Sequence, residues 1–286
     1  MNKKIRNIRP HLIDEDTHLN VQVYKDRINR QENNRHHSGL NMVNVSTPEE
    51  SILIRGYATV LEQSLHDIDI QHPLVPLKLT LNKTTGAKNG YLICCGDYAQ
   101  QCLESIREYI KLGDRIINLG GGLGITATYA GILSKNPVTI IEPNIKMHPT
   151  IHKNADLNDI SIKLLQACIT PENDESLTEF HIMEEPLSSS IFKYAQEVDT
   201  SYKVETISLQ KLIQESHANV IISDIVGAEI NAFENIDLRQ IDKVIITINT
   251  PIIGEKPTAN LITTLSKQGF ELKDIKGLVF SFIRTK

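Results

Sequence analysis

The chain has 286 residues, of which 40% are hydrophobic and 23% are charged, so it can bury the core of one large domain and is not disordered throughout. Its net charge of −5 argues against a generally cationic nucleic-acid binder. No apolar run approaches the roughly 20 residues of a membrane-spanning helix, and four cysteines do not resemble a disulfide framework in a chain this long, so we expect a reduced, cytoplasmic protein.

The first ninety residues are expected to form an extension in front of the main domain. Residues 1–45 are polar and irregular, whereas Thr47-Pro-Glu-Glu50 has the pattern of a helix start with a capping box. The helix predicted over residues 47–65 carries apolar side chains at every fourth position, namely Leu53, Tyr57, Leu61 and Leu65. An isolated helix is marginally stable in water, so this apolar face needs a partner. That partner is either the rim of the functional site, with the helix as a lid, or a second subunit in a homodimer, which we favour.

A hairpin and a helix are predicted next. The hairpin pairs strands over residues 77–81 and 91–95 around a turn at residues 85–90. Residues 98–112 have helical periodicity, and Gly113 is placed to end that helix. The extension is expected over residues 1–90, so it ends just before the second strand of this hairpin.

From residue 114 onward, short apolar strands alternate with helices. The seven predicted strands cover residues 115–119, 138–141, 162–167, 220–223, 243–248, 270–275 and 278–283. The helices predicted between them cover residues 126–133, 149–157, 229–236 and 258–268. Strands separated by helices of this size predict an α/β fold with a doubly wound, mostly parallel seven-stranded sheet, and we assign it to residues 91–286.

A glycine-rich turn follows the first of these strands, at Asn118-Leu-Gly-Gly-Gly-Leu-Gly124. In a doubly wound sheet, the ligand lies beyond the carboxyl ends of the strands, where the strand order reverses. The dinucleotide fingerprint Gly-x-Gly-x-x-Gly would need glycine at Ile125. The spacing of Gly120, Gly122 and Gly124 is instead the Gly-x-Gly-x-Gly form associated with S-adenosylmethionine, although a bare structural turn would also use glycines.

Two carboxylates end other strands of the predicted sheet. Glu142 follows the strand at 138–141, where a carboxylate can accept both hydroxyl protons of a ribose. Asp224 follows the strand at 220–223, where it could orient a substrate, accept its proton or help hold a divalent metal. The alternative for Asp224 is the cap of the helix that opens at Glu229. No histidine has the spacing of a metal site, so the sequence does not support a metal cofactor.

Several blocks in order resemble the FkbM-type class I methyltransferases, over roughly residues 97–284. The blocks that carry the resemblance are Leu112-Gly-Asp-Arg-Ile-Ile-Asn-Leu-Gly120, Ile141-Glu-Pro-Asn144, Lys153-Asn-Ala-Asp-Leu-Asn158, Glu205-Thr-Ile-Ser-Leu209 and Ile222-Ser-Asp-Ile-Val-Gly-Ala-Glu229. The last block is the most diagnostic of the family. The chain departs from the family pattern at Asn118, where Asp is usual, at Gly121-Gly122, where Ala-Asn is usual, and at Val226, where Glu is usual.

The resemblance implies an S-adenosylmethionine-dependent methyltransferase with a Rossmann-like sheet, acting on a hydroxyl of a sugar or small secondary metabolite. The cofactor-binding residues would be Asn118, Gly120, Gly122, Gly124, Glu142, Asn144 and Ala167, and Asp224 would be catalytic. Two alternatives stay open: a methyltransferase acting on a peptide or protein, and a catalytically silent cofactor-binding scaffold. Nucleic acid is disfavoured as a partner by the net charge and the few aromatic residues, and no membrane partner is expected.

Overall fold

The computed structural model describes residues 67–170, 176–183, 189–191 and 198–285. It divides into two compact units, Met1–Gln100 and Gln101–Lys286. The polar segment 1–45 and the helix predicted over residues 47–65 lie outside the described residues. The boundary expected after residue 90 falls inside a helix, α3 (Ala87–Cys95).

The described part of the first unit contains one antiparallel hairpin, but not the predicted one. Strand β1 (Ile68–Gln71) pairs with β2 (Lys78–Leu81). The strand predicted at residues 91–95 is wrong, because these residues belong to helix α3. A short apolar run fits either a strand or a buried helix, and periodicity alone does not separate the two. The overlooked signal is Gly96, which has φ +80° and donates its N–H to the Ile93 carbonyl, as a glycine that ends a helix does.

The second unit is built on a seven-stranded sheet with the strand order β11-β12-β10-β9-β3-β4-β5. Its strands are β3 (Ile116–Leu119), β4 (Val138–Ile141), β5 (Ile162–Leu165), β9 (Val220–Ser223), β10 (Lys243–Thr247), β11 (Phe270–Lys276) and β12 (Val279–Arg284). Neighbouring strands are parallel except where β12 pairs with β10 and β11. The α/β class and the doubly wound, mostly parallel, Rossmann-like sheet predicted from the sequence are therefore confirmed.

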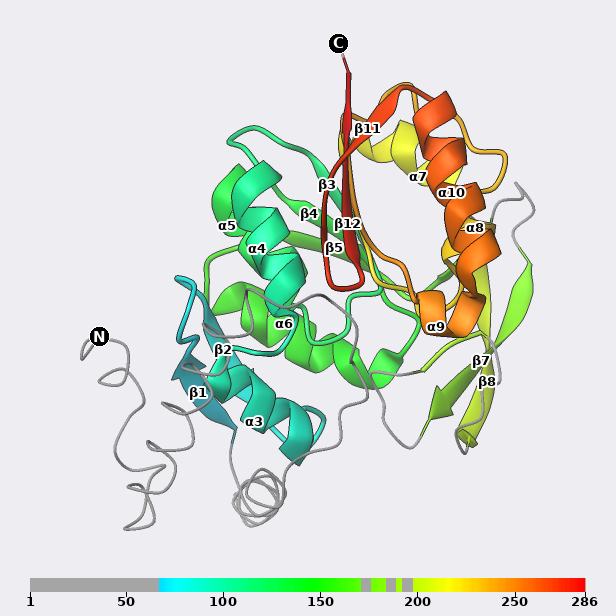
Figure 1. Ribbon diagram of the computed structural model, residues 1–286. Helices are drawn as coiled ribbons and strands as arrows, with labels where there is room; N and C mark the ends of the chain where they lie inside the picture. The colour runs from blue at the N-terminus through cyan, green and yellow to red at the C-terminus, as the bar shows by residue number, and fades with distance from the viewer. Residues whose placement is uncertain (1–66, 171–175, 184–188, 192–197, 286) are drawn as a thin grey trace. The chain divides into compact units, whose positions relative to one another are not determined.

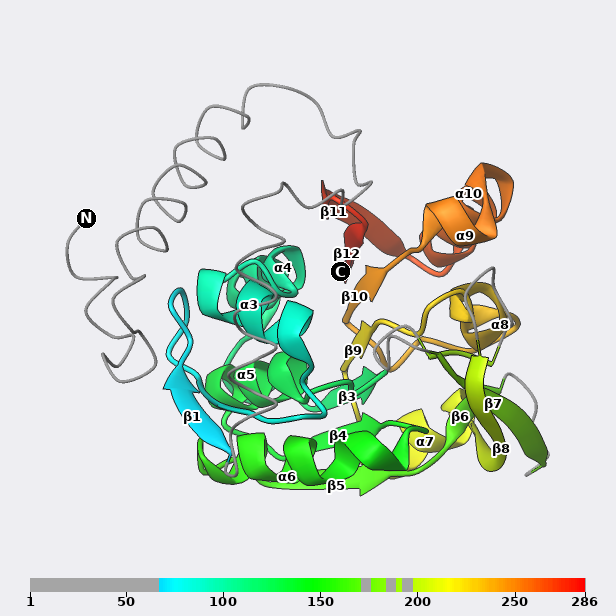
Figure 2. The same ribbon diagram turned by 90° about the horizontal axis from the view of Figure 1, so that it is seen from below.

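Helices cover both faces of this sheet (Figures 1 and 2). One face carries α4 (Gln100–Tyr109), α5 (Ile125–Ser134) and α6 (His148–Asp156), the last preceded by the 3-10 turn η3 (Ile145–Met147). The other face carries α7 (Leu209–Ser216), α8 (Glu229–Phe233) and α10 (Glu255–Lys267), which follows the short α9 (Thr250–Ile253). All four residues of β3 and of β9 are buried, because a parallel strand covered on both faces packs side chains on each side.

The strand order reverses between β3 and β9. The chain runs outward from β3 through β4 to β5, and then returns to place β9 on the other side of β3. The helices that follow β3 and β9, α5 and α8, therefore lie on opposite faces of the sheet, and doubly wound sheets hold their ligands at such a point. The glycine turn (residues 120–124) leaves β3 at this point, and Asp224 leaves β9.

A second, three-stranded sheet is inserted between β5 and α7. It consists of β6 (Cys168–Thr170), β7 (Leu177–Met183) and β8 (Val198–Ser208), in the order β6-β8-β7. None of these three strands is among the seven predicted for the main sheet. Figure 2 shows this sheet beyond the ends of β4 and β5, toward which their arrowheads point.

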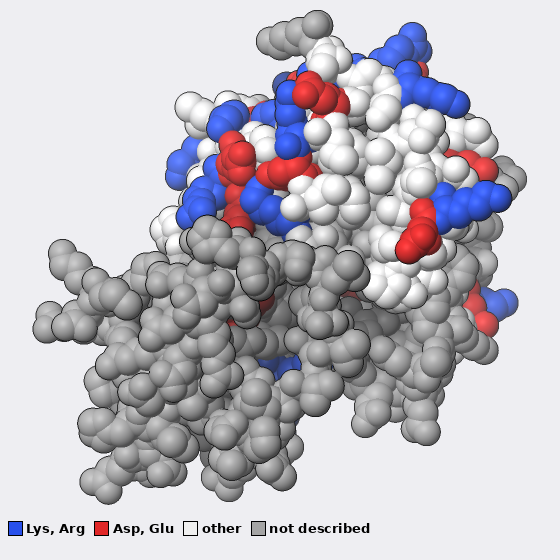
Figure 3. Space-filling model, viewed as in Figure 1, with Lys and Arg blue, Asp and Glu red and all other residues white. Residues whose placement is uncertain are grey.

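On the face that Figure 3 shows, the surface of the described residues carries both signs of charge, interspersed. On β11, Lys273 pairs with Glu271 at 2.6 Å, and Lys276 pairs with Asp274 and Glu108. In the described part of the chain, no helix is both long and apolar enough to cross a membrane.

Candidate functional site

The loops that leave β3 and β9 touch at the point where the strand order reverses. Asp224 donates its backbone N–H to the carbonyl of Leu119 at 2.9 Å. Gly120 has φ +79°, and a Cβ atom there would lie 2.0 Å from the Asp224 carbonyl oxygen. Only glycine satisfies both the left-handed backbone and this close approach. The glycine turn and Asp224, predicted from separate strand ends, are therefore adjacent.

The glycine turn is held by two neighbouring segments. The N–H of Gly120 donates to the carbonyl of Ile141, the last residue of β4, at 2.9 Å. On α6, the Asn154 side chain donates to the carbonyl of Leu123 at 2.8 Å. Gly124 has φ +76° and precedes α5, and a Cβ atom there would lie 3.1 Å from the Cα of Ile151. The turn is thus fixed against β4 and α6 before any ligand arrives.

Glu142 joins the end of β4 to the glycine turn. One carboxylate oxygen accepts the N–H of Gly122 at 2.7 Å, and the other accepts the N–H of Asn144 at 2.7 Å. The side chain is buried, and this burial raises its pKa to about 7, against the opposing effect of the backbone N–H groups. Because each carboxylate oxygen carries a second lone pair, Glu142 can still accept hydrogen bonds from two hydroxyl groups.

The other predicted cofactor residues lie within or shortly after strands of the sheet. Asn118, in β3, is buried, and its side-chain NH2 donates to the Ile222 carbonyl at 3.4 Å while its Oδ1 has no hydrogen-bond partner. The Oδ1 of Asn144 accepts the N–H of Lys146, and its buried Nδ2 has no partner. Ala167 is buried just after β5. The buried, unpartnered amide oxygen of Asn118 is an acceptor suited to an ammonium group.

Asp224 combines access to solvent with poor hydration. Its side chain is exposed, but the protein atoms gathered around it reduce the hydration of the carboxylate. This desolvation, with the nearby charge of Glu229, raises its pKa to about 7, while a hydrogen bond with Thr247 opposes the rise. The helix-cap alternative is wrong, because α8 begins after Ala228 and has no side-chain cap. The pKa of Asp224 is therefore close to that of an effective general base at neutral pH.

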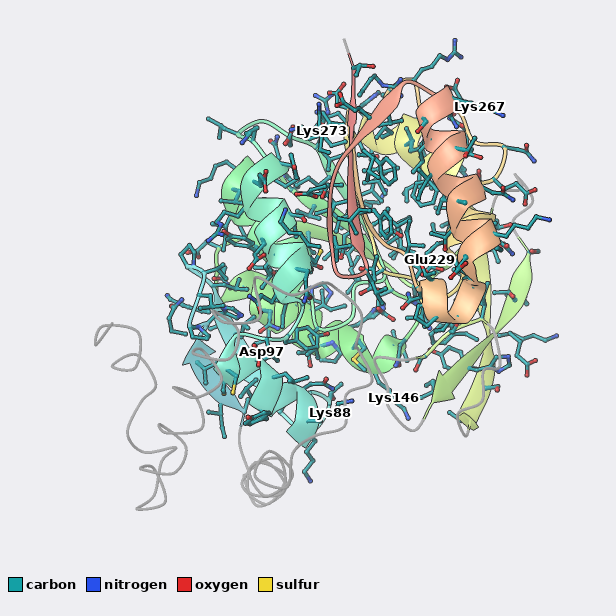
Figure 4. All side chains as sticks on the ribbon, in the orientation of Figure 1. Lys88, Asp97, Lys146, Glu229, Lys267 and Lys273 are labelled. Atoms are coloured by element: carbon teal, nitrogen blue, oxygen red, sulfur yellow. The ribbon has the colours of Figure 1, made fainter. Side chains whose placement is uncertain are left out.

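Glu229 and Asn249 belong to the same region, and neither was among the predicted site residues. Glu229 is fully buried and accepts both the side-chain NH2 of Asn249 at 2.7 Å and its backbone N–H at 3.3 Å. Figure 4 shows Glu229 beside α9 and α10. The available signal was position, since Asn249 follows β10 as Asp224 follows β9.

The loop after β9 has an unusual backbone at Val226, a position where the FkbM-type enzymes usually have Glu. Val226 has φ +36° and Gly227 has φ +85°. A β-branched residue with positive φ is a strained outlier, and such strain often lies at functional sites. The Val226 carbonyl accepts the hydroxyl of Ser190 at 2.9 Å, which connects this loop to the inserted sheet region.

The described residues contain no group of three or more His, Cys, Asp or Glu side chains arranged to hold a metal ion. Near Glu142, the His148 ring contacts the Glu142 carbonyl at 2.8 Å. All four cysteines lie among the described residues, and none of them forms a disulfide.

The residues where the strand order reverses have the donor and acceptor groups that S-adenosylmethionine needs. Glu142 offers acceptors for ribose hydroxyls, Asn118 offers an acceptor for the methionine ammonium group, and the glycine turn allows close approach of the backbone. This fit rests on the donor and acceptor chemistry of the chain's own residues.

Comparisons with known proteins give one short sequence match. No protein-family model matches the chain. The chain is 35% identical over 65 residues to a ribosomal protein L11 methyltransferase of Caldicellulosiruptor saccharolyticus. This aligned segment covers 23% of this chain and 22% of that relative. The chain thus aligns with about a fifth of the length of this curated relative.

Solved structures of methyltransferases resemble the chain more broadly but remotely. A ribosomal protein L11 methylase from Lactobacillus delbrueckii subsp. bulgaricus shares 13% identity with a TM-score of 0.40, over 65% of this chain and 78% of that one. A putative SAM-dependent methyltransferase from Streptococcus mutans shares 12% identity with a TM-score of 0.47, over 77% of this chain and 55% of that one. At this distance the fold assignment rests on the strand order of the chain itself.

Proposed function

We propose that the protein is an S-adenosylmethionine-dependent methyltransferase whose cofactor lies over the glycine turn. The observation that carries the proposal is the carboxylate of Glu142, held by two backbone N–H groups beside that turn where the strand order reverses. A nicotinamide dinucleotide is disfavoured, because its fingerprint needs a glycine where Ile125 begins α5 as a buried residue.

Each strand end has a separate part in this proposal. Glu142 accepts the ribose hydroxyls, the Asn118 amide oxygen accepts from the methionine ammonium group, and Asn144 and Ala167 lie at neighbouring strand ends. Asn118 replaces the family's Asp, so this contact lacks the strength of a charge-assisted hydrogen bond. When bound, S-adenosylmethionine supplies the methyl group on its sulfonium, and the chain supplies position and a base.

The acceptor we favour is a hydroxyl of a sugar or small metabolite, as the resemblance to the FkbM-type enzymes implies. Asp224 would take the hydroxyl proton, a role that its exposure and its pKa of about 7 support. Asp224 would hold this proton until it is released to solvent, while the bound cofactor would supply the methyl group to the acceptor oxygen.

A peptide or protein acceptor is the second candidate. It is supported by the local match to a ribosomal protein L11 methyltransferase, at 35% identity over 65 residues. Asp224 would serve a protonated amine equally well, since a nitrogen acceptor must also lose a proton before it attacks.

Calorimetry on the full chain tests the cofactor, and an acceptor panel tests the reaction. We expect S-adenosylhomocysteine to bind and NAD to show no heat of binding. Tight binding of NAD alone would refute the proposal. Methyl transfer from labelled S-adenosylmethionine to sugars, phenols and peptides then separates the acceptor classes, and cofactor binding without transfer to any of them would favour the silent scaffold.

A further inference from the structure

The inserted sheet reaches the proposed ribose site through one tyrosine. We propose that Tyr202, on β8, is a positioning residue that aims the Glu142 carboxylate at the cofactor ribose by holding the peptide group that follows it. This inference rests on the proposed function, because it assigns the inserted sheet a task in cofactor binding.

The ring of Tyr202 is anchored within the inserted sheet. Tyr202 lies opposite Phe180 in the register of β7 and β8, and the two rings pack edge to face with centroids 6.0 Å apart. Phe180 is buried, whereas Tyr202 is half-buried. The ring position is therefore set by the sheet, and its hydroxyl extends toward the loop after β4.

The hydroxyl holds both sides of Asn144. It donates to the Pro143 carbonyl at 2.7 Å and accepts the Ile145 N–H at 3.4 Å. A phenol that donates and accepts at once restricts the rotation of the backbone between its two partners.

One peptide group links this hydroxyl to Glu142. The Pro143 carbonyl and the Asn144 N–H belong to the same planar peptide unit, so their directions are coupled. The carbonyl receives the Tyr202 hydroxyl at 2.7 Å, while the N–H donates to Glu142 Oε1 at 2.7 Å. Consecutive hydrogen bonds of this kind polarise one another. The Tyr202 hydroxyl therefore both orients and strengthens the hydrogen bond from the Asn144 N–H to Glu142.

Without the Tyr202 hydroxyl, the Pro143–Asn144 peptide group loses the hydrogen bond at its carbonyl. The other oxygen of Glu142 keeps its bond to Gly122, so the carboxylate stays near the glycine turn but rotates more freely. We therefore expect the variant Tyr202→Phe to lose recognition of the ribose hydroxyls while the rest of the cofactor site is retained.

The test compares adenosine with 2′,3′-dideoxyadenosine, which lacks both ribose hydroxyls. In the wild-type full chain, we expect adenosine to bind more tightly than the dideoxy analogue. In Tyr202→Phe, the ratio of the two affinities should fall about fivefold or more. The affinity for S-adenosylhomocysteine should fall about tenfold. A general loss of stability would weaken the binding of both nucleosides alike and would leave the ratio of their affinities unchanged.

Tyr109→Phe is the matched control, because Tyr109 also donates its hydroxyl in a hydrogen bond, to Asp274 at 3.1 Å, on the distant strand β11. We expect wild-type ratios in this variant. If Tyr202→Phe does not fold, Tyr202→Met removes the hydroxyl and fills the space with a flexible apolar side chain.

The outcomes separate the two proposals. If wild-type protein binds no S-adenosylhomocysteine, the proposed function fails, and the role of Tyr202 falls with it. If wild-type protein binds S-adenosylhomocysteine and prefers adenosine, but the hydroxyl-free variants keep the full preference, only the role of Tyr202 is overturned.

Discussion

Replacing Glu142 by glutamine tests the centre of the proposed site. The side chain accepts two backbone N–H groups, from Gly122 and Asn144, each at 2.7 Å. Glutamine keeps the shape but has one acceptor oxygen, so its NH2 group must face one of these N–H groups. We expect S-adenosylhomocysteine affinity to fall about 10–100-fold, or about 1.4–2.7 kcal/mol, for a lost charge-assisted contact.

The same substitution changes the pH dependence of stability. Burial raises the pKa of Glu142 from 4.5 to about 7, so its contribution to folding is fully present below pH 4.5 and is lost as the pH rises through 7. From these two values, the stability of the wild-type protein falls by roughly 2–3 kcal/mol through this group between pH 5 and pH 8. Glutamine does not titrate, so the variant should gain about that much relative to wild type over the interval.

Urea unfolding at pH 5 and pH 8, with calorimetry of S-adenosylhomocysteine binding, measures both effects. Only the difference between variant and wild type is compared, so other titrating groups cancel. Glu215→Gln, at an exposed position of α7, is the matched control and should leave cofactor affinity and the pH dependence as in wild type. Unchanged affinity together with a pH-independent stability difference in Glu142→Gln would refute this account of the site.

Three further predictions concern other parts of the chain. Asp224→Asn should reduce turnover on the order of 100-fold or more, while the affinity for S-adenosylhomocysteine stays near that of wild type. A normal rate with an acceptor that the wild-type protein methylates would show that Asp224 has no catalytic role. Asp114→Ala should lower the free energy of unfolding, measured in urea, by about 3–5 kcal/mol. Lys243 Nζ lies 2.6 Å from the Asp114 carboxylate with only 15% of its side chain exposed, so the substitution leaves a buried charge without its partner. A change under about 1 kcal/mol would contradict this. Deletion of residues 1–66 should yield a monomer by light scattering with cofactor binding retained, whereas an unchanged mass with lost acceptor turnover would favour a lid.

Local sequence was sufficient for the central sheet. Strands such as β3 and β9 are short apolar runs between turn and helix signals, and burial on both faces makes such runs continuous in sequence. The rule that ligands lie at carboxyl strand ends then singled out the glycine turn, Glu142 and Asp224, because it needs only strand positions and direction. The structure brings the backbone of these loops together, as the Gly120–Asp224 approach shows.

Tertiary structure decided what depends on distant partners. The apolar run ending at Cys95 becomes helix α3 instead of a strand, since both states suit it locally. The inserted sheet pairs β6 with β8 across more than thirty residues, and no local pattern specifies such a register. The burial of Glu229 and the reach of Tyr202 to the Pro143 carbonyl likewise follow from packing between segments far apart in the chain. Residue type and spacing thus predicted which strand ends would carry chemistry, whereas long-range packing decided which backbone groups contact the side chains there.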